Sequence, residues 1–468
     1  MSYQNQTTNN EKGTAYEKRL QSYAMKRLVI LGGGESGVGA ALLSKQKGYD
    51  VVLMDEGSLK EGYRNELKNA AVSFVENGID EGRLFNADEV VKSPGIGEKN
   101  EWVKKLRANR IPIISEIELA YRYKGDSKII AVTGSNGKST TTSLIYHICK
   151  TAGLDCALVG NIGYSFARQL AQEPKALYVA EISSFQLDDI VTFRADVGLL
   201  LNITEDHLDR YDYKFENYIR SKFRIAMNQT AGDYFIYNLD DEVVTKYLEQ
   251  NQIQSIQLPM SMKEKVEKGG YIQADQLHVK VESEEQSMSI YDFALKGKHN
   301  QYNTMAASVA GATMDIRKSK IREAVETFEN LEHRSEAVAT VRGVDFVNDS
   351  KATNVNSTWY ALESMTKPTI LILGGVDKGN DYSTIKDLVQ EKVKAIVCMG
   401  TDNSKIHEAF DGEVKLIDTA SAENAVQTAF QLASPGDVVL LSPACASFDL
   451  FKNYEDRGTQ FKEAVKNL

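Results

Sequence analysis

The sequence of 468 residues contains few cysteines and no spacing typical of a zinc site or a disulfide framework. The four cysteines are scattered and never form a C-x-x-C pair, so neither kind of site is indicated. This usage fits a reducing cytoplasm, where we expect the protein to act. The cysteines are Cys149, Cys156, Cys398 and Cys445.

Long apolar segments and an excess of basic residues are also missing. No apolar run approaches 18 residues, and no positively charged segment followed by an apolar one opens the chain, which argues against membrane insertion and export. The formal net charge of −10 argues against a nucleic-acid binder, because such proteins usually carry a basic domain or stripe. Small anionic ligands stay possible, since they need only local cations.

The remaining composition is that of an ordinary globular protein. Hydrophobic residues make up 42% and charged residues 26% of the chain. A length of 468 residues exceeds what one core supports, and a prior of about 150 residues per domain suggests three domains. Residues 1–24 are polar with Leu20 as their only large aliphatic side chain, so we expect a flexible extension there, and Met25 stands directly before the first predicted strand.

A phosphate-binding loop is the clearest motif. Residues 129–142 read IIAVTGSNGKSTTT, which predicts a strand, a glycine turn and a helix N-terminus. Backbone N–H groups in such a turn face an anion, and Lys138 brings a positive charge to the outer phosphates. The general pattern asks for glycine where Val132 stands, so the loop is a variant. It predicts triphosphate binding by Gly134, Ser135, Asn136, Gly137, Lys138, Ser139 and Thr140, with Ser139 or Thr140 placed to bind Mg²⁺.

A second glycine turn opens the first predicted domain, residues 25–116. Gly32, Gly34 and Gly37 follow a strand and match G-x-G-x-x-G, and Asp55 ends the next strand about 20 residues later, as in dinucleotide sites. A nicotinamide site is one interpretation. Any diphosphate is another, because the turn requires only close backbone approach and a helix N-terminus.

The second predicted domain, residues 117–331, alternates strands and helices and ends with an antiparallel ribbon between about 252 and 296. Asn161, Glu181, Asn202 and His207 lie at or just after the carboxyl ends of predicted strands. Ligands bind at the carboxyl edge of an open parallel sheet, so we expect these side chains to converge near the phosphate loop. A carboxylate such as Glu181 there suits Mg²⁺, which prefers hard oxygen ligands.

The third predicted domain, residues 332–468, places three polar segments after strands. They are NDSKATN (348–354), GGVDKG (374–379) and SPACASFDLFKNYEDRG (442–458). Together they predict one polar cleft that faces the nucleotide domain. Such a cleft suits phosphorylation of a carboxylate by ATP, followed by attack of an amine on the acyl phosphate, with catalysis by positioning and charge neutralisation.

These motifs resemble the Mur ligase family of peptidoglycan synthesis, over residues 25–468. The similar segments are TGSNGKST, EISSFQ, NITEDHLDRY, the Lys222 helix, GKHNQYN and the HR pair at 333–334. The resemblance implies three α/β domains in series: a Rossmann-like UDP-binding domain, a central P-loop ATPase-type domain with a mostly parallel sheet, and a C-terminal Rossmann-like domain. NDSKATN with the 442–458 segment is similar to the family member that adds D-glutamate to UDP-N-acetylmuramoyl-L-alanine, giving ADP and phosphate.

The resemblance also implies roles for individual residues. Lys138, Ser139, Thr140 and Glu181 would hold the ATP phosphates and a first Mg²⁺, and His207 with a carbamylated Lys222 would serve a second Mg²⁺ that shares Glu181. An ammonium repels Mg²⁺, whereas a carbamate is an oxygen ligand. Lys351 would lie near the transferred phosphate. The nucleotide would be lined by Asn300, Asn303, Arg334 and Asp349, and a monomer is expected.

Substrate-binding residues follow from the same resemblance. The uracil and diphosphate of the acceptor would contact Ser36, Asp55 and Ser93, and the muramoyl arm would contact Asn161, Ser183 and Gln186. D-glutamate would contact Thr353, Lys378, Ser447 and Tyr454. Three alternatives stay open at the level of the residues: a folylpolyglutamate synthase with the same ATP machinery, a nicotinamide-binding oxidoreductase built on Gly32 to Asp55, and a regulatory ATPase without ligase chemistry.

Overall fold

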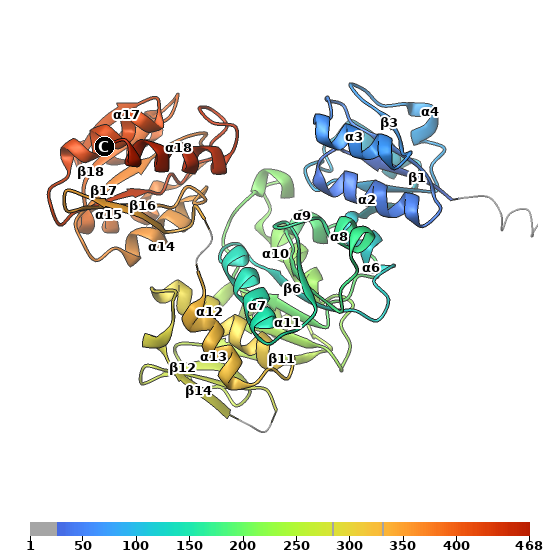
Figure 1. The fold of residues 1–468 in the computed structure, drawn as a ribbon, viewed down its shortest axis with the longest axis horizontal. Coiled ribbons are helices and arrows are strands. Elements are labelled where there is room, and N and C mark those ends of the chain that lie inside the picture. Colours follow the sequence, from blue (N-terminus) through green and yellow to red (C-terminus); the bar gives the residue numbers. More distant parts are fainter. Residues whose placement is uncertain (1–25, 283–284, 330–331) are drawn as a thin grey trace, which may run out of the picture.

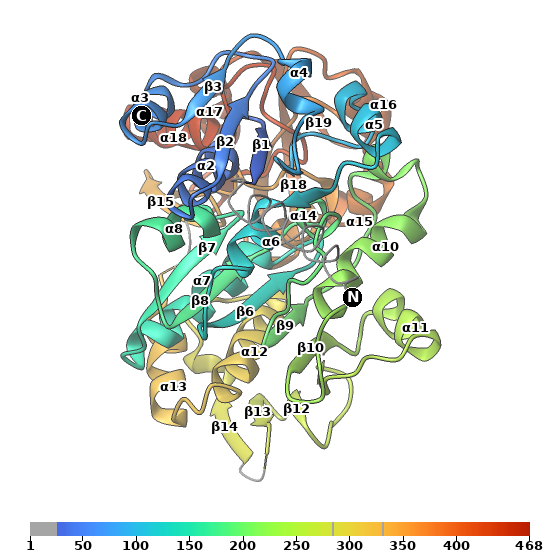
Figure 2. The same cartoon turned by 90° about the vertical axis from the view of Figure 1, so that its right-hand side faces the viewer.

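The computed structural model describes residues 26–282, 285–329 and 332–468, which form three α/β units, each built on one sheet (Figure 1). The expected extension at residues 1–24 lies outside the described residues. The N-terminal and C-terminal units both lie on the same side of the central unit, as two perpendicular views show (Figures 1 and 2). Among the described residues, no helix has the length and apolar character needed to cross a membrane.

The N-terminal unit has a five-stranded parallel sheet in the order β3-β2-β1-β4-β5. The sequence did not predict β3, a three-residue strand of which no residue is buried. The strands are β1 (Arg27–Leu31), β2 (Asp50–Met54), β3 (Ser73–Val75), β4 (Glu89–Lys92) and β5 (Ile113–Ser115). The helices are α2 (Glu35–Gln46), α3 (Glu61–Asn69), α4 (Glu81–Leu84), α5 (Glu101–Ala108) and α6 (Glu116–Tyr121).

The central unit has a nine-stranded sheet in the order β14-β13-β12-β11-β10-β9-β6-β8-β7, and Figure 2 shows β7, β8, β6, β9 and β10 side by side. The expected antiparallel ribbon is confirmed for the last three strands, whereas β11 pairs in parallel with both neighbours. Helix α11 (Glu242–Gln250) returns the chain across the sheet between β10 and β11. The strands are β6 (Lys128–Thr133), β7 (Cys156–Gly160), β8 (Leu177–Glu181), β9 (Val197–Leu200), β10 (Tyr234–Asn238), β11 (Ile256–Ser261), β12 (Gly269–Gln273), β13 (Gln276–Lys280) and β14 (Glu285–Ser289).

Helices cover both faces of the parallel part of this sheet. Strand β6 therefore reads as a continuous apolar run: Ile129 and Ala131 belong to one buried cluster, and Ile130 and Val132 belong to the other. Burying each isoleucine side chain contributes roughly 1.5–3 kcal/mol. The helices are α7 (Lys138–Thr151), α8 (Phe166–Gln172), α9 (Ser184–Leu187), α10 (Phe215–Phe223), α11 (Glu242–Gln250), α12 (Lys298–Ala312) and α13 (Lys318–Thr327), and short 3₁₀ turns include η1 (Leu208–Tyr211).

The C-terminal unit has a six-stranded sheet in the order β15-β16-β20-β17-β18-β19, in which β15 and β16 form an antiparallel hairpin and the other pairings are parallel. The sequence did not predict β19, an edge strand of half-buried and exposed residues. The strands are β15 (Glu336–Val341), β16 (Val344–Asn348), β17 (Thr369–Leu373), β18 (Val393–Met399), β19 (Lys415–Thr419) and β20 (Val438–Leu441). The helices are α14 (Val355–Ser364), α15 (Lys386–Lys392), α16 (Ser404–Phe410), α17 (Ala422–Leu432) and α18 (Tyr454–Lys466).

Candidate active site

The loop between β6 and α7 has the shape that phosphate binding requires. Gly134 and Gly137 have φ angles of 153° and 81°, which side chains other than glycine rarely adopt. A Cβ atom on Gly137 would also overlap the side-chain oxygen of Asn303 from α12. The segment after β9 holds the loop from the other side: the amide N–H of Asn136 donates to Asn202 Oδ1 at 2.8 Å, and Asn202 Nδ2 donates to the Asn136 carbonyl at 3.0 Å.

Two lysines converge on this loop. Lys138 Nζ donates to the carbonyl oxygens of Gly134 and Ser135 at 2.9 and 2.8 Å, and Lys222 Nζ from α10 donates to the Gly134 carbonyl at 2.7 Å. Burial lowers the pKa of Lys138, and it lowers the pKa of Lys222 well below its ordinary value, with the charge of Lys138 adding to the effect. The side-chain nitrogens of Lys138 and Lys222 therefore both lie beside the Gly134 carbonyl.

Three buried oxygens around the loop have no hydrogen-bond partner within the described residues: Thr133 Oγ1, Thr140 Oγ1 and Glu181 Oε2. The other oxygen of Glu181 accepts from Asn161 Nδ2 at 2.8 Å. Burying an oxygen without a partner is costly unless a ligand satisfies it. Hydroxyl and carboxylate oxygens are the ligands that Mg²⁺ prefers, so the residues present fit a magnesium site beside the phosphate loop.

A cavity of about 280 Å³ lies next to these groups and receives residues from the N-terminal and central units. His207, which follows β9 with a left-handed φ of 53°, faces it, and its ring meets the Phe185 ring edge-on at 5.1 Å. Burial lowers the pKa of His207. The structure thus brings together five of the residues predicted from the sequence. The lining residues are Pro94, Gly95, Lys138, Asn161, Ser183, Ser184, Phe185, Asp206, His207, Tyr218 and Lys222.

Gln186 has a structural contact that the sequence did not indicate. The side-chain oxygen of Gln186 accepts from the backbone N–H of Ser183 at 2.9 Å. The backbone N–H of Gln186 donates to Ser183 Oγ at 3.3 Å, and the two bonds form a capping box at the start of α9. The two residues therefore fix each other at the wall of the 280 Å³ cavity.

A second cavity, of about 300 Å³, lies between the central and C-terminal units. Six residues predicted to bind ATP or to lie near the transferred phosphate line it: Asn136, Gly137, Asn303, Arg334, Asp349 and Lys351. Asn300 lies next to Asn303 and accepts a hydrogen bond from it: Asn303 Nδ2 donates to Asn300 Oδ1 at 3.1 Å. The Ser357 hydroxyl of α14 donates a hydrogen bond to Asn136 Oδ1 at 3.0 Å, which links the C-terminal unit to the central one.

Burial shifts the pKa values of two C-terminal groups in this cavity. It lowers the pKa of Lys351 to about 8, and Arg334 adds to the effect. It raises the pKa of Asp349 to about 6, against the opposing charge of Arg334. Lys351 Nζ lies 5.5 Å from the centre of the Tyr454 ring. A negatively charged group entering between Arg334 and Lys351 would relieve the repulsion between their charges.

Residues expected to bind the uracil and diphosphate lie at the carboxyl edge of the N-terminal sheet. Asp55 accepts from the Gly33 amide at 2.5 Å and from the Gly57 amide at 2.7 Å, which shapes the glycine turn. Ser93 donates to the Gly32 carbonyl at 3.3 Å, and Ser36 is half-buried in the first turn of α2.

Residues expected to bind the amino acid come from three loops of the C-terminal unit. The positive charge of Lys378 contributes to the lowered pKa of His207, so the two side chains lie within electrostatic range across the units. Burial raises the pKa of Tyr454, and the carboxylates of Glu455 and Glu181 add to this. Ser447 is buried, and Thr353 is half-buried before α14.

The matches to known proteins agree with this layout. Three sequence profiles match: the Mur ligase MurD-like N-terminal domain (residues 26–115), the Mur ligase middle domain (132–311) and the Mur ligase glutamate ligase domain (333–445). The chain is 51% identical over 444 residues to the UDP-N-acetylmuramoylalanine–D-glutamate ligase of Christiangramia forsetii, covering 95% of this chain and 100% of that protein. It is 50% identical to the ligase of the same name from Bacteroides fragilis, with the same coverage.

The chain belongs to the Mur ligase family.

Solved structures of other Mur ligases share the fold at low sequence identity. The UDP-N-acetylmuramate-alanine ligase of Thermotoga maritima superposes with a TM-score of 0.60 at 16% identity, covering 95% of this chain and 99% of that one. MurF of Acinetobacter baumannii gives a TM-score of 0.60 at 14% identity, covering 95% and 92%. The expected arrangement of three α/β domains, mostly with parallel sheets, is thereby confirmed.

Sequence reasoning missed several side chains that line the 300 Å³ cavity of this Mur ligase. His299 and Tyr302 lie within the GKHNQYN segment, so their position beside Asn300 and Asn303 was a usable signal. Trp359 and Tyr360 lie on α14, where aromatic residues in a helical pattern look like ordinary core. Their place at the cavity depends on how the C-terminal domain packs.

A Cys–His–Asp cluster lies away from this site, and the cysteine spacing had not indicated it. Cys398 of β18 lies opposite Asp418 of β19 in the paired strands, and His407 Nε2 of α16 lies 3.0 Å from Asp418 Oδ1. His407 and Asp418 thus already satisfy each other by hydrogen bonding. All four cysteines are free thiols.

Proposed function

We propose that the protein joins D-glutamate to UDP-N-acetylmuramoyl-L-alanine at the expense of ATP, releasing ADP and phosphate, as a cytoplasmic monomer in peptidoglycan precursor synthesis. One observation carries the proposal: adjacent residues of a single phosphate loop line two different cavities. Asn136 and Gly137 face the 300 Å³ cavity, and Lys138 faces the 280 Å³ cavity. A nucleotide in the first cavity would present its terminal phosphate to an acceptor in the second. Relatives about 50% identical carry this activity in their names.

In this proposal, the nucleotide lies between the central and C-terminal domains. The backbone of residues 134–140 and Lys138 bind its phosphates, and Asn300, Asn303, Arg334 and Asp349 surround it. The cavity also offers aromatic side chains on which a base can stack, such as Tyr302 and Tyr360. Lys351 lies beside Arg334 and Tyr454, where it neutralises charge on the transferred phosphate.

We further propose two magnesium ions. Ser139, with Thr140 beside it, and Glu181 would hold the first, and His207 and a carbamylated Lys222 would hold the second, with Glu181 shared. The unpartnered buried oxygens of Thr140 and Glu181 support the first site. When bound, the ions neutralise phosphate charge and polarise the terminal phosphate. The buried position of Lys222, 2.7 Å from a loop carbonyl, suits a carbamate formed from its neutral amine and carbon dioxide with loss of a proton.

The reaction divides into two transfers. A carboxylate oxygen of the acceptor attacks the terminal phosphorus of ATP, the bond to ADP breaks, and an acyl phosphate forms. The amine of D-glutamate then attacks the acyl carbon, the carbon–oxygen bond to phosphate breaks, and the amine loses a proton. Ser36, Asp55 and Ser93 would bind the uridine diphosphate, and Asn161, Ser183 and Gln186 the muramoyl arm. Thr353, Lys378, Ser447 and Tyr454 would bind D-glutamate.

Phosphate release measured against a panel of amino acids and acceptors tests this function. We expect release with ATP, Mg²⁺, UDP-N-acetylmuramoyl-L-alanine and D-glutamate together, and little release when the acceptor or the amino acid is omitted. Activity with L-glutamate and a folate in place of these substrates would contradict the proposal. NADH fluorescence provides a second check, since saturable binding competed by NAD but not by UDP contradicts a UDP site at Gly32 to Asp55.

The extents of the domains are part of the same proposal. We assign the acceptor-binding domain to residues 25–116, the ATP-binding domain to 117–331 and the amino-acid-binding domain to 332–468. The matched profiles, at 26–115, 132–311 and 333–445, support these extents.

A further inference from the structure

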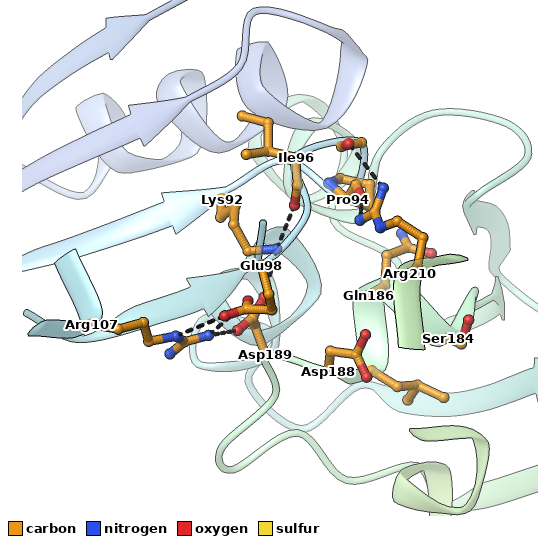
Figure 3. Close-up of polar contacts among 12 residues, drawn as sticks. Lys92, Pro94, Ile96, Glu98, Arg107, Ser184, Gln186, Asp188, Asp189 and Arg210 are labelled. Carbon is orange, nitrogen blue, oxygen red and sulfur yellow. Dashed lines mark hydrogen bonds and ion pairs between the residues drawn. The ribbon is translucent and has the colours of Figure 1, made fainter. Parts of the chain in front are cut away.

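Arg210 connects two loops: the loop after β4 of the N-terminal domain and the loop after β9 that carries His207. The loop after β4 forms a tight turn in which the Ile96 amide donates to the Ser93 carbonyl at 3.0 Å. Arg210, three residues after His207, reaches this turn from the central domain (Figure 3). Its two terminal nitrogens donate to consecutive carbonyls, Nη2 to Pro94 at 3.0 Å and Nη1 to Gly95 at 3.1 Å.

The guanidinium of Arg210 is itself held in place. It lies over the Phe185 ring, 4.2 Å from the ring centre, and the same ring meets His207 edge-on. A Cβ atom on Gly97 would come within 3.0 Å of Arg210 Nε, so glycine leaves the room that the guanidinium occupies. The contacts therefore run without interruption from Gly95 through Arg210 and Phe185 to His207.

A buried ion pair fixes the far end of the same turn. Lys92 Nζ donates to the Ile96 carbonyl at 2.8 Å and lies 2.9 Å from Asp189 of the central domain (Figure 3). Asp189 also pairs with Arg107 at 2.5 Å. Lys92 and Asp189 are both buried, so separating them would leave the Lys92 ammonium without its counter-charge. Cations thus hold the carbonyls of Pro94, Gly95 and Ile96.

Holding these carbonyls determines where the amides point. The described residues contain no cis peptide bond, and in a trans peptide the C=O and N–H groups point in opposite directions. The Gly95 N–H therefore points away from Arg210. This amide donates no hydrogen bond within the described part of the chain, and Gly95 is exposed and lines the 280 Å³ cavity. The turn therefore fixes the direction of a donor that no described group uses.

We infer that Arg210 is a positioning residue for the acceptor: it fixes the Ser93–Ile96 turn, presents the Gly95 amide to an anionic group of the acceptor, and sets the distance from that turn to His207. The inference rests on the proposed function, because it assigns the 280 Å³ cavity to the UDP-linked carboxylate substrate. Lysine cannot reproduce this role, since an ammonium lacks the planar fork that reaches two carbonyls at once and stacks on an aromatic ring.

Steady-state kinetics and calorimetry of Arg210→Ala and Arg210→Lys test the inference. We expect KM for the UDP-linked acceptor to rise at least 10-fold in both variants, with KM for ATP within about 2-fold of wild type. Calorimetry without ATP should show the same loss of acceptor affinity. Arg220→Ala is the matched control: Arg220 lies on α10 nearby, pairs with Glu216 at the surface, and should leave both KM values unchanged.

The outcomes separate this inference from the proposed function. If wild type releases phosphate with acceptor and D-glutamate and Arg210→Ala keeps its acceptor KM, the positioning role is wrong. Equal rises in KM for acceptor and ATP would also overturn it, because general loosening of the fold would then explain the loss. If wild type has no acceptor-dependent activity, the proposed function itself fails. A circular dichroism melt of each variant shows whether the fold is retained, and full rescue in Arg210→Lys would contradict the two-carbonyl geometry.

Discussion

The side-chain nitrogen of Lys222 donates a 2.7 Å hydrogen bond to the backbone carbonyl of Gly134, although 88 residues separate them in the sequence. The contact brings a helix of the central domain to the first glycine of the phosphate loop. A protonated lysine in that buried place faces the charge of Lys138 as well as the cost of desolvation, which together lower the pKa of Lys222. The site therefore favours a form of Lys222 without positive charge.

Replacing Lys222 by alanine should abolish ligation and leave nucleotide binding nearly intact. We expect a loss of at least about 100-fold in phosphate release, because an oxygen ligand of the proposed second metal disappears. ATP affinity, measured by calorimetry, should stay within a few-fold of wild type. A short carboxylic acid such as acetate should restore part of the rate in Lys222→Ala. Wild-type activity in this variant would contradict the carbamate role.

Replacing Lys138 by alanine should stop formation of the acyl phosphate. In the proposed reaction Lys138 neutralises the outer phosphates, and removal of such a group costs on the order of 100-fold or more in rate. Isotope transfer from the terminal phosphate of ATP to the acceptor measures this step directly. Lys150→Ala, on the last turn of the same helix, is a control that should behave as wild type. Undiminished turnover in Lys138→Ala would exclude the loop from catalysis.

Replacing Gly137 by alanine should weaken ATP binding more strongly than the addition of one methyl group suggests. The added Cβ meets Asn303, and the φ of 81° is unfavourable for alanine at a cost of about 1–2 kcal/mol. We expect KM for ATP to rise at least 5-fold while KM for the acceptor changes little. Gly125→Ala has a similarly positive φ but open space around its Cβ, so it separates backbone strain from the clash.

Glu116 should make the protein less stable as the pH rises. It is fully buried between α2 and α8; burial, with the nearby carboxylate of Glu35, raises the pKa of Glu116 to about 8, while the Ala167 amide opposes the shift. Because the folded-state pKa exceeds the unfolded value, the folded state binds more protons between about pH 4.5 and 8, and the free energy of unfolding falls across that window.

The variant Glu116→Gln removes this titration. It should match wild type near pH 5 and be more stable at pH 8.5, by on the order of 1–3 kcal/mol, since each unit of pKa difference corresponds to about 1.4 kcal/mol. Urea unfolding at both pH values measures the difference. Arg168 also faces Glu35, at 2.7 Å, so that ion pair must be intact in both proteins for a fair comparison. Parallel stability curves for variant and wild type would contradict the assignment.

Local signals were sufficient for the phosphate loop, most strands and the resemblance to a family. The run from Ile129 to Thr142 combines apolar residues, glycines at special backbone positions and a lysine, and each of these acts within a few residues of its neighbours. The three-residue strand β3 and the edge strand β19 escaped the same reasoning. Both lie at the edge of a sheet and neither contains a buried residue, so little apolar burial marks them in the sequence.

The sequence alone indicated a glycine turn suited to phosphate and most of the segments that become strands, because backbone geometry and apolar periodicity are local properties. Only the tertiary structure decided that Lys222 meets Gly134 and that Arg210 holds the turn after Ser93. These contacts join residues 88 and 116 positions apart, and they depend on the order of strands and the packing of domains. Nothing in the neighbouring residues specifies that order, since the same local patterns fit many arrangements.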